Sequence, residues 1–282
     1  MIVGWWQHIP EHINPVIFGL GPLKLRWYGL MYLVAFFVVW LLSVWRINKG
    51  EISVKKDELE QLILWEFLGV VIGGRLGYVL FYDLPFFIGH PLSIFLPGLT
   101  NEGFGLAGMS YHGGVIGAIV ALVIFTRKKG INIWHLTDGI IPAVPLGFTF
   151  GRIGNFINGE LYGRETSSSI GMYFPADPYG LLRHPSQLYE AFFEGIVLFA
   201  ILWSIRNKDK FPGFLLAIYF IGYGFFRFFI EFFRQPDPQL GFVLLGLTMG
   251  QLLCSAMIVA GAIIILIQHR IKASSISSEK QS

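Results

Sequence analysis

The sequence predicts an all-α integral membrane protein with seven transmembrane helices, its N-terminus outside the cell and its C-terminus in the cytoplasm. Three observations predict this class. Of the 282 residues, 54 % are hydrophobic and only 14 % are charged, against about 25 % charged in soluble domains. Seven apolar stretches are close to the roughly 20 residues that a helix needs to cross a bilayer. The Lys and Arg residues gather in alternate connections between those stretches.

The predicted spans follow one another from residue 27 to residue 267. They cover residues 27–45, 61–82, 104–126, 134–153, 188–205, 213–232 and 243–267. The fourth contains Pro142 and Pro145, which lack the N–H that a helix needs, so we expect a kink there. The first 26 residues are rich in Trp and Pro without a basic start and an apolar core, and they predict an interfacial segment.

The cations predict the orientation. The connections after the odd-numbered spans hold 13 of the 21 Lys and Arg residues, whereas residues 83–103 hold none. The positive-inside rule therefore places those connections in the cytoplasm. We expect one polytopic domain over residues 1–282, with an exterior loop or head over 154–187. Residues 273–282, rich in Ser and charge, predict a disordered cytoplasmic tail.

Several polar side chains fall inside predicted spans, where each is costly unless it is paired or faces water. At about 1.5 Å per helical residue, Arg75 and Arg227 lie some 21 Å along outward-running helices, in the outer third of a roughly 30 Å core. Other spans place polar groups in the same outer half, namely His112 (about 12 Å inward from the outer end of its span), Arg152, Tyr28 and Tyr32. We expect one outward-open cavity with three guanidinium groups and an imidazole. Because Arg binds phosphate bidentately, the expected ligand is an anionic phospholipid headgroup.

Structural roles compete with ligand binding at these positions. Tyr223, Arg227 and Glu231 share a helix face, so Arg227 either pairs with Glu231 or faces the substrate. Arg75 either bonds carbonyl groups between helices or contacts the ligand. Arg234 is either a ligand contact or an ordinary interfacial cation.

Two glycine-rich segments carry further polar groups. His112 precedes two glycines and is either bonded to a neighbour or a general base, since an imidazole titrates near neutral pH. Residues 151–163 lack the Lys-Ser/Thr ending of a P-loop. With Arg152, Asn155 and Glu160 on turns that glycines permit, this segment suits a small polyol phosphate; the alternative is a capped helix end.

Other classes lack support in the sequence. The single Cys254 excludes a disulfide framework and a cysteine-ligated metal site, and we predict no metal and no cofactor. A net charge of +3 is too small for a nucleic-acid partner. An intramembrane hydrolase has no motif to support it. An anion or lipid channel or transporter also uses intramembrane Arg, but it predicts cations reachable from both faces and often an internal repeat.

Five blocks of sequence occur in order between residues 26 and 237. They are residues 26–32 (RWYGLMY), 111–114 (YHGG), 151–163 (GRIGNFINGELYG), 183–190 (RHPSQLYE) and 223–237 (YGFFRFFIEFFRQPD). Together they resemble the phosphatidylglycerol–prolipoprotein diacylglyceryl transferase family. The resemblance implies a bacterial enzyme of the cytoplasmic (inner) membrane with its active site toward the exterior half. Such an enzyme moves the diacylglyceryl group of phosphatidylglycerol to the lipobox cysteine of a preprolipoprotein signal peptide and releases glycerol phosphate.

The same resemblance implies the functional positions, which are His112, Arg152, Asn155, Glu160, Gly163, Tyr28, Tyr223, Arg227 and Arg234. We expect His112 to accept the thiol proton while Arg152 and Arg227 bind the phosphate and stabilise charge as it departs. Asn155 and Glu160 would orient the glycerol headgroup, and the two tyrosines would bond headgroup oxygens or Arg side chains. A mechanism without His112, in which the arginines lower the thiol pKa, remains open.

Overall fold

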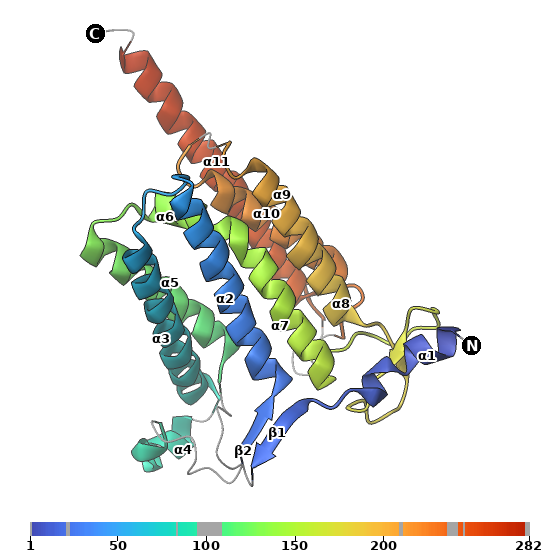
Figure 1. Ribbon diagram of the computed structural model, residues 1–282. Helices are drawn as coiled ribbons and strands as arrows, with labels where there is room; N and C mark the ends of the chain where they lie inside the picture. The colour runs from blue at the N-terminus through green and yellow to red at the C-terminus, as the bar shows by residue number, and fades with distance from the viewer. Residues whose placement is uncertain are drawn as a thin grey trace. The chain divides into compact units, whose positions relative to one another are not determined.

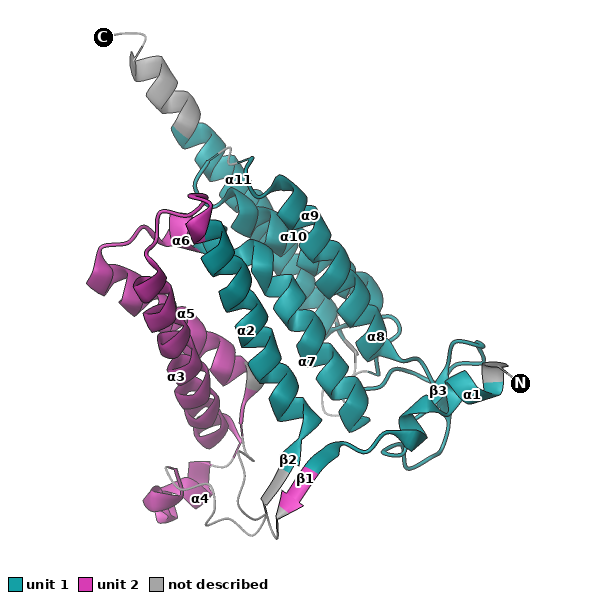
Figure 2. Cartoon of the chain, in the orientation of Figure 1, with its two compact units in different colours: residues 1–17, 25–46, 137–282 teal, residues 18–24, 47–136 magenta. Residues whose placement is uncertain are grey.

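The computed structural model describes residues 2–20, 23–82, 84–94, 109–208, 211–235, 242–244 and 246–279, and these residues are mostly helical (Figure 1). The contacts divide the chain into two compact units (Figure 2), and the single polytopic domain stays a prediction. Unit 1 comprises residues 1–17, 25–46 and 137–282, and unit 2 comprises residues 18–24 and 47–136.

Five helical segments of the described chain are long and apolar enough to cross a membrane. They are Trp27–Asn48, Lys56–Phe81, Ile133–Asn158, Ser186–Ile205 and Met249–Ile271. The two other predicted spans contain α5 (Tyr111–Lys129), whose 19 residues end on three basic side chains, and α10 (Phe214–Ile230), which has 17 residues. A helical fold with membrane-spanning segments is thus confirmed, and the count of seven spans stays a prediction.

Helices of unit 1 lie side by side (Figure 1). They are α2 (Trp27–Asn48), α7 (Val144–Asn158), α9 (Leu198–Ile205), α10 and α11 (Met249–Glu279). Glycines let two pairs of neighbouring helices approach closely, α2 with α7 and α10 with α11. A Cβ atom added to Gly147 of α7 would lie 3.1 Å from the carbonyl oxygen of Ala35 on α2, and one on Gly224 of α10 would lie 2.8 Å from that of Cys254 on α11.

The fourth predicted span is interrupted where its prolines lie. Helix α6 (Ile133–Ile140) is followed by the 3₁₀ turn η4 (Ile141–Ala143), which contains Pro142, and then by α7. Helix α7 continues to Asn158, so the prediction that Arg152 and Asn155 lie on glycine-permitted turns is wrong. The chain leaves the helix at Gly159, whose φ of 69° suits glycine. A capped helix end therefore describes the backbone of this segment, and its binding of a polyol phosphate stays a prediction.

The fifth predicted span changes its helical geometry within the bundle. Helix α8 (Ser186–Glu190) runs into a π-helical segment, η5 (Ala191–Val197), and then into α9. The Thr149 hydroxyl on α7 donates to the carbonyl oxygen of Ala191 at 3.3 Å. A Cβ atom on Gly195 would overlap that same hydroxyl. π-Helical segments are rare and often lie at functional sites.

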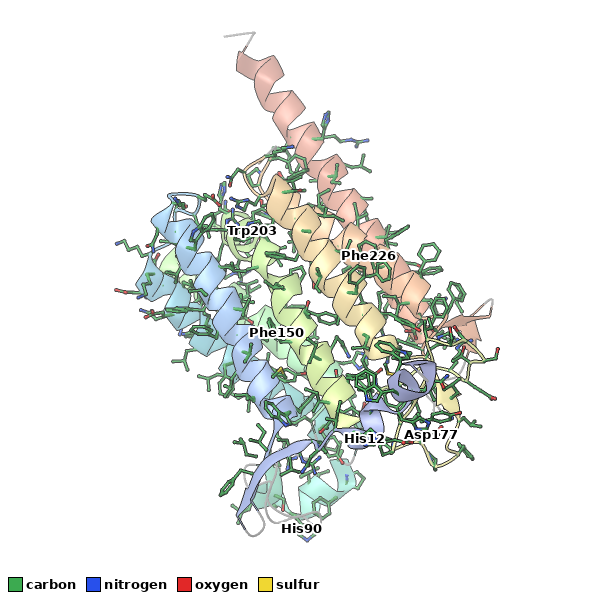
Figure 3. The ribbon with its side chains drawn as sticks, turned by 45° about the vertical axis from the view of Figure 1, so that its right-hand side comes forward. His12, His90, Phe150, Asp177, Trp203 and Phe226 are labelled. Atoms are coloured by element: carbon green, nitrogen blue, oxygen red, sulfur yellow. The ribbon has the colours of Figure 1, made fainter. Side chains whose placement is uncertain are left out.

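Residues 160–185, called the head below, follow α7. Their strands β3 (Met172–Tyr173) and β4 (Leu182–Arg183) pair antiparallel, with Met172 opposite Arg183. The N-terminal elements α1 (Ile2–Gln7) and η1 (Ile9–His12) belong to the same unit. There the ring of His8 stacks on Tyr173 at 4.9 Å. Figure 3 shows Asp177 of the head at the opposite end of the unit 1 helices from Trp203. Strands β1 (Val16–Leu20) and β2 (Leu23–Arg26) form another small sheet before α2.

Unit 2 is built on the contact between α3 (Lys56–Phe81) and α5, with α4 (Leu84–Gly89) and the 3₁₀ turn η2 (Pro91–Ile94) after α3. Facing glycines bring the two long helices together. An added Cβ on Gly73 would lie 2.7 Å from the Cα of Gly117, and one on Gly77 would lie 2.7 Å from that of Gly113. Much of the glycine in spans two and three thus serves helix packing.

Two spans begin later than predicted because side chains cap the helices. Residues 104–108 lie outside the described residues, and α5 begins only after Ser110, whose hydroxyl accepts the N–H of Gly113. Strands β5 (Phe242–Leu244) and β6 (Leu247–Thr248) precede α11, which begins at Met249. Helix α11 continues to Glu279, so residues 273–279 are helical where the sequence predicts a disordered tail.

Candidate functional site

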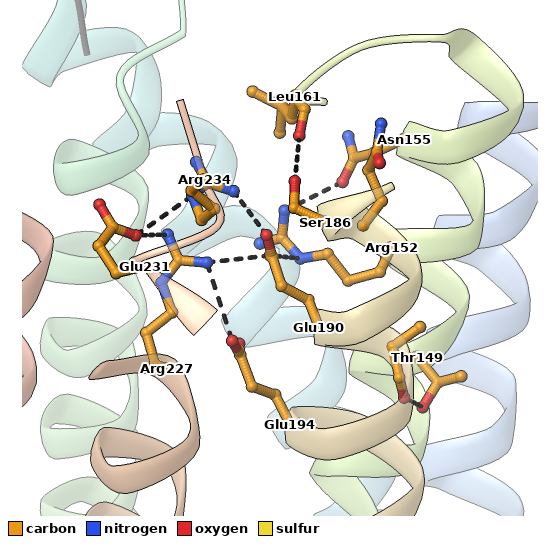
Figure 4. A network of polar contacts seen from close by, with 12 residues as sticks. Thr149, Arg152, Asn155, Leu161, Ser186, Glu190, Glu194, Arg227, Glu231 and Arg234 are labelled. Atoms are coloured by element: carbon orange, nitrogen blue, oxygen red, sulfur yellow. Dashed lines mark hydrogen bonds and ion pairs between the residues drawn. The ribbon is translucent and has the colours of Figure 1, made fainter. Parts of the chain in front are cut away.

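The carboxylate of Glu190 lies among three arginine side chains in unit 1 (Figure 4). Its Oε2 atom is 3.0 Å from Nε of Arg152 and 3.0 Å from Nη1 of Arg227. Its Oε1 atom accepts a 2.6 Å hydrogen bond from Nη1 of Arg234. Glu190 is 0 % exposed. Three of the predicted site residues therefore converge on an acid that was not among them.

Two further acids complete this arginine cluster. Oε2 of Glu231 lies 3.1 Å from Nη2 of Arg227 and 3.3 Å from Nε of Arg234. Glu194, in η5, is fully buried, and its Oε1 atom lies 3.8 Å from Nη1 of Arg227. Opposite charges at these distances explain how the guanidinium groups are tolerated inside the bundle. The three arginine side chains keep 14–17 % of their surface exposed, so the carboxylates do not enclose them completely.

The contacts decide between some of the alternatives. Arg227 pairs with Glu231, as the structural alternative predicts, but it also contacts Glu190 on another helix. Arg234 is not an ordinary interfacial cation, because its guanidinium group is paired with two buried carboxylates. Glu190 and Glu194 lie four residues apart inside a predicted apolar span, and this was the signal that could have identified them. The cost of burying a charge applies to carboxylates as it does to cations.

A second row of polar contacts leads from the arginine cluster toward the head. Nη1 of Arg152 donates to Oδ1 of Asn155 at 3.1 Å, and Nδ2 of Asn155 donates to Oε1 of Glu160 at 2.8 Å. The carbonyl oxygen of Glu160 accepts a 2.7 Å hydrogen bond from Nε2 of Gln187. Arg152 also lies over the ring of Phe148, 4.6 Å from its centroid. Three predicted residues thus form one continuous chain of hydrogen bonds.

The backbone directly after Glu160 is strained. Leu161 has a φ of 59°, in the left-handed region that side chains other than glycine rarely adopt. The Ser186 hydroxyl at the start of α8 holds it there by donating to the Leu161 carbonyl oxygen at 3.0 Å. Strain of this kind costs about 1–3 kcal/mol and gathers at functional sites.

Gly163 contributes space for the backbone of Arg234. Its N–H donates to the carbonyl oxygen of His184 at 2.8 Å, and the next N–H, of Arg164, donates to that of Phe233 at 2.8 Å. Nε of Arg164 donates to the carbonyl oxygen of Arg234 at 2.7 Å. A Cβ atom at Gly163 would overlap the Phe233 carbonyl oxygen and lie 2.9 Å from that of His184. In the structure, this glycine therefore allows the head to hold Arg234.

The two predicted tyrosines lie next to α7. Tyr28 on α2 lies against Gly154, because a Cβ atom added to Gly154 would be 3.4 Å from the Tyr28 ring. The Tyr28 hydroxyl donates to the Tyr32 hydroxyl at 3.0 Å. Tyr223 packs edge-on against Phe148 with ring centroids 5.8 Å apart. It also interacts electrostatically with Arg152 and Arg227.

His112 and Arg75 belong to unit 2. Because α5 begins at Tyr111, His112 is an exposed residue in its first turn, and the predicted depth of about 12 Å inside a helix is wrong. Arg75 donates to the carbonyl oxygens of Ser93 at 2.6 Å and Ile94 at 3.0 Å, which is the structural role considered for it. That His112 and Arg75 share one cavity with the arginine cluster stays a prediction.

The head contains a buried ion pair. Arg183 donates from Nε and Nη2 to the two carboxylate oxygens of Asp177 at 2.8 and 3.0 Å. These bonds lower the pKa of Asp177 and raise that of Arg183. Burial lowers the pKa of the neighbouring His184. Within the described part of the chain, no group of three or more His, Cys, Asp or Glu side chains is arranged to hold a metal ion.

Known proteins resemble this chain over nearly its whole length. Residues 15–267 match the family model described as prolipoprotein diacylglyceryl transferase. The phosphatidylglycerol–prolipoprotein diacylglyceryl transferase of Chlorobaculum tepidum is 56 % identical over 261 residues, 91 % of this chain and 90 % of that protein. Proteins with the same name from Bordetella parapertussis (49 % over 251 residues; 89 % and 93 %) and Francisella tularensis subsp. holarctica (45 % over 257 residues; 90 % and 93 %) are also similar. The chain therefore belongs to the prolipoprotein diacylglyceryl transferase family, as its five sequence blocks predict.

Proposed function

We propose that this protein transfers the diacylglyceryl group of phosphatidylglycerol to the lipobox cysteine of a preprolipoprotein, the first step of lipoprotein maturation. The observation that carries this proposal is the family match over residues 15–267, together with relatives of that name at 45–56 % identity. The arginine cluster supports it, because a phospholipid phosphate needs cationic donors held at membrane depth.

The phosphate of phosphatidylglycerol would bind at the exposed edges of Arg152, Arg227 and Arg234. Each guanidinium group has five N–H donors in a planar fork, so pairing with Glu190 leaves donors for a second anion. The carboxylates hold the forks in position before the lipid arrives, and such preorganisation favours transition-state stabilisation. The hydrogen-bonded row from Arg152 to Glu160 would lie beside the glycerol headgroup and orient its hydroxyl groups.

The reaction forms a carbon–sulfur bond and breaks the bond between the diacylglyceryl carbon and a phosphate oxygen. The leaving oxygen keeps the electron pair and departs as glycerol phosphate. The nucleophile is the substrate's thiolate, which explains why no enzyme cysteine is needed. A thiol with a pKa near 8.5 is only a few per cent ionised at about pH 7. We assign His112 to accept its proton, while Arg152 and Arg227 stabilise the charge that develops on the phosphate.

We further propose seven membrane spans in the bacterial cytoplasmic membrane, with the C-terminus in the cytoplasm and the site in the outer half. The packing of unit 1 supports this orientation. Nη2 of Arg46, near the end of α2, donates to the carbonyl oxygen of Arg206 at the end of α9 at 3.4 Å. The basic ends of the first and fifth predicted spans therefore meet, which is consistent with both ends lying on the cytoplasmic side that the positive-inside rule assigns to them. Asp138 lies beside these basic ends, because its carbonyl oxygen accepts a hydrogen bond from Arg46. Its carboxylate accepts the N–H groups of Gly213 and Leu216 at the start of α10. Arg227 lies near the opposite end of α10.

The decisive assay mixes the purified protein with phosphatidylglycerol labelled in its diacylglyceryl part and a lipobox peptide. One peptide carries the cysteine, and its matched control carries serine in that place. The expected result is label on the cysteine peptide alone, with release of glycerol phosphate. No transfer to either peptide by folded protein would overturn the proposal.

A further inference from the structure

The first residues of α11 lie directly against the arginine cluster. Thr248, which precedes the helix and is 3 % exposed, donates from its hydroxyl to Oε1 of Glu231 at 3.1 Å. The same hydroxyl accepts the N–H of Gln251 at 3.2 Å, and the Thr248 N–H donates to Oε1 of Gln251 at 3.1 Å. This reciprocal pair is a capping box. One buried hydroxyl thus caps α11 and holds a carboxylate of the cluster.

Gly250 leaves the space that this contact needs. A Cβ atom there would lie 2.7 Å from Oε1 and 2.8 Å from Cδ of Glu231. A side chain at this position would therefore displace the carboxylate. The start of a helix also favours a negative charge, because its free N–H groups carry the positive end of the helix dipole.

The two oxygens of Glu231 have different partners. Oε1 faces Thr248, whereas Oε2 faces Nη2 of Arg227 and Nε of Arg234. A carboxylate held at one oxygen cannot rotate freely about its terminal bond. The hydroxyl of Thr248 therefore determines which way Oε2 points, and with it the orientation of two guanidinium groups.

We infer that Thr248 is a positioning residue of the transfer reaction, acting through Glu231 on Arg227 and Arg234, and that Gly250 is required for the same reason. The inference rests on the proposed function. In this scheme Thr248 does not touch the substrate. It holds the guanidinium groups in the orientation in which they receive the phosphate.

The test uses the full-length protein in detergent with phosphatidylglycerol mixed micelles and the cysteine lipobox peptide. Thr248→Val keeps the shape and removes the hydroxyl, and Thr248→Ser keeps the hydroxyl. Ser255→Ala is the matched control, because it removes a hydroxyl of α11 whose one hydrogen bond among the described residues goes to the carbonyl oxygen of Gln251 on its own helix. Rates over a range of lipid concentrations give kcat and KM, and thermal unfolding reports folding.

Thr248→Val is expected to lower kcat/KM on the order of tenfold or more, the effect of losing a hydrogen bond to a charged group. Thr248→Ser and Ser255→Ala should stay near the wild-type value. Gly250→Ala is the second variant: it leaves the cap in place, displaces Glu231, and should reproduce the loss.

Wild-type kcat/KM in folded Thr248→Val overturns the inference, even if its melting temperature falls. If Thr248→Val does not fold, Gly250→Ala decides in the same way. The inference is also overturned if the losses appear equally in Ser255→Ala. A wild-type protein that transfers no label would instead overturn the proposed function, so the two failures are distinguishable.

Discussion

Arg234 donates a 2.6 Å hydrogen bond to Glu190, which lies 44 residues earlier in the chain. The acid is fully buried and also lies 3.0 Å from both Arg152 and Arg227. One carboxylate therefore joins α7, α8 and the end of α10. The residues that we expect to bind phosphate owe their arrangement to a residue that we do not expect to touch the substrate.

Glu190→Gln should lower both the melting temperature and the transfer rate. The substitution keeps the shape of the side chain but leaves three guanidinium groups without their shared counter-charge, and breaking a buried ion pair costs about 3–5 kcal/mol. Thermal unfolding in detergent and the labelled-lipid assay measure the two effects. The exposed head residue Glu165, changed to Gln, is the control and should match the wild type. A Glu190→Gln protein with normal stability and rate would contradict the role given to this acid.

His112→Gln should reduce transfer by about 10²- to 10⁴-fold, the usual contribution of a general base. Its melting temperature should stay unchanged, because the side chain is exposed in the first turn of α5. His90→Gln, at another exposed histidine of unit 2, serves as the control. Full activity in His112→Gln would remove the general-base role and favour a mechanism in which the arginine cluster lowers the thiol pKa.

Gly163→Ala should strongly reduce transfer, because the new methyl group would push apart the head and the backbone that carries Arg234. Gly151→Ala, within α7, is its control. An added Cβ at Gly151 meets nothing within 4 Å, and alanine suits the helix in which this residue lies. Comparing the lipid-dependent rates of the two variants tests the prediction, which fails if both are equally active.

The head should lose stability in acid through Asp177. Its pKa is lower in the folded protein than in the unfolded chain because of Arg183. The ion pair therefore contributes its full stability above the unfolded pKa of about 3.9. That contribution is lost as the pH falls through the lower, folded pKa. His184, whose pKa burial also lowers, acts in the same direction, starting from about pH 6.5.

Limited proteolysis of the head over a pH series measures this loss. Asp177→Asn should make the head more susceptible near neutral pH and should flatten the change below about pH 4. If the wild-type protein and Asp177→Asn had the same profile, the ion pair would not stabilise the head.

The membrane class, the approximate positions of the five spans found in the described residues, and the family could all be predicted from the sequence. Hydropathy needs no tertiary information, because each spanning helix satisfies its own backbone hydrogen bonds. The kink at Pro142 is equally local. Helix ends are harder to predict, since Ser110, Thr248 and Gly159 determine them through single hydrogen bonds or one backbone angle.

The composition of the site depended on tertiary structure. The sequence by itself singled out Arg152, Arg227 and Arg234, and the spacing of Arg227 and Glu231 on one helix gave their pairing as one of two alternatives. Only the packing of α7, α8 and α10 brought Glu190 between the three arginines, because contacts between helices depend on rotation and depth that no local pattern records. In the same way, the sequence places Thr248 inside the predicted span 243–267. Its cap of α11 appears only in the structure, and so does its contact with Glu231, for which Gly250 leaves the space.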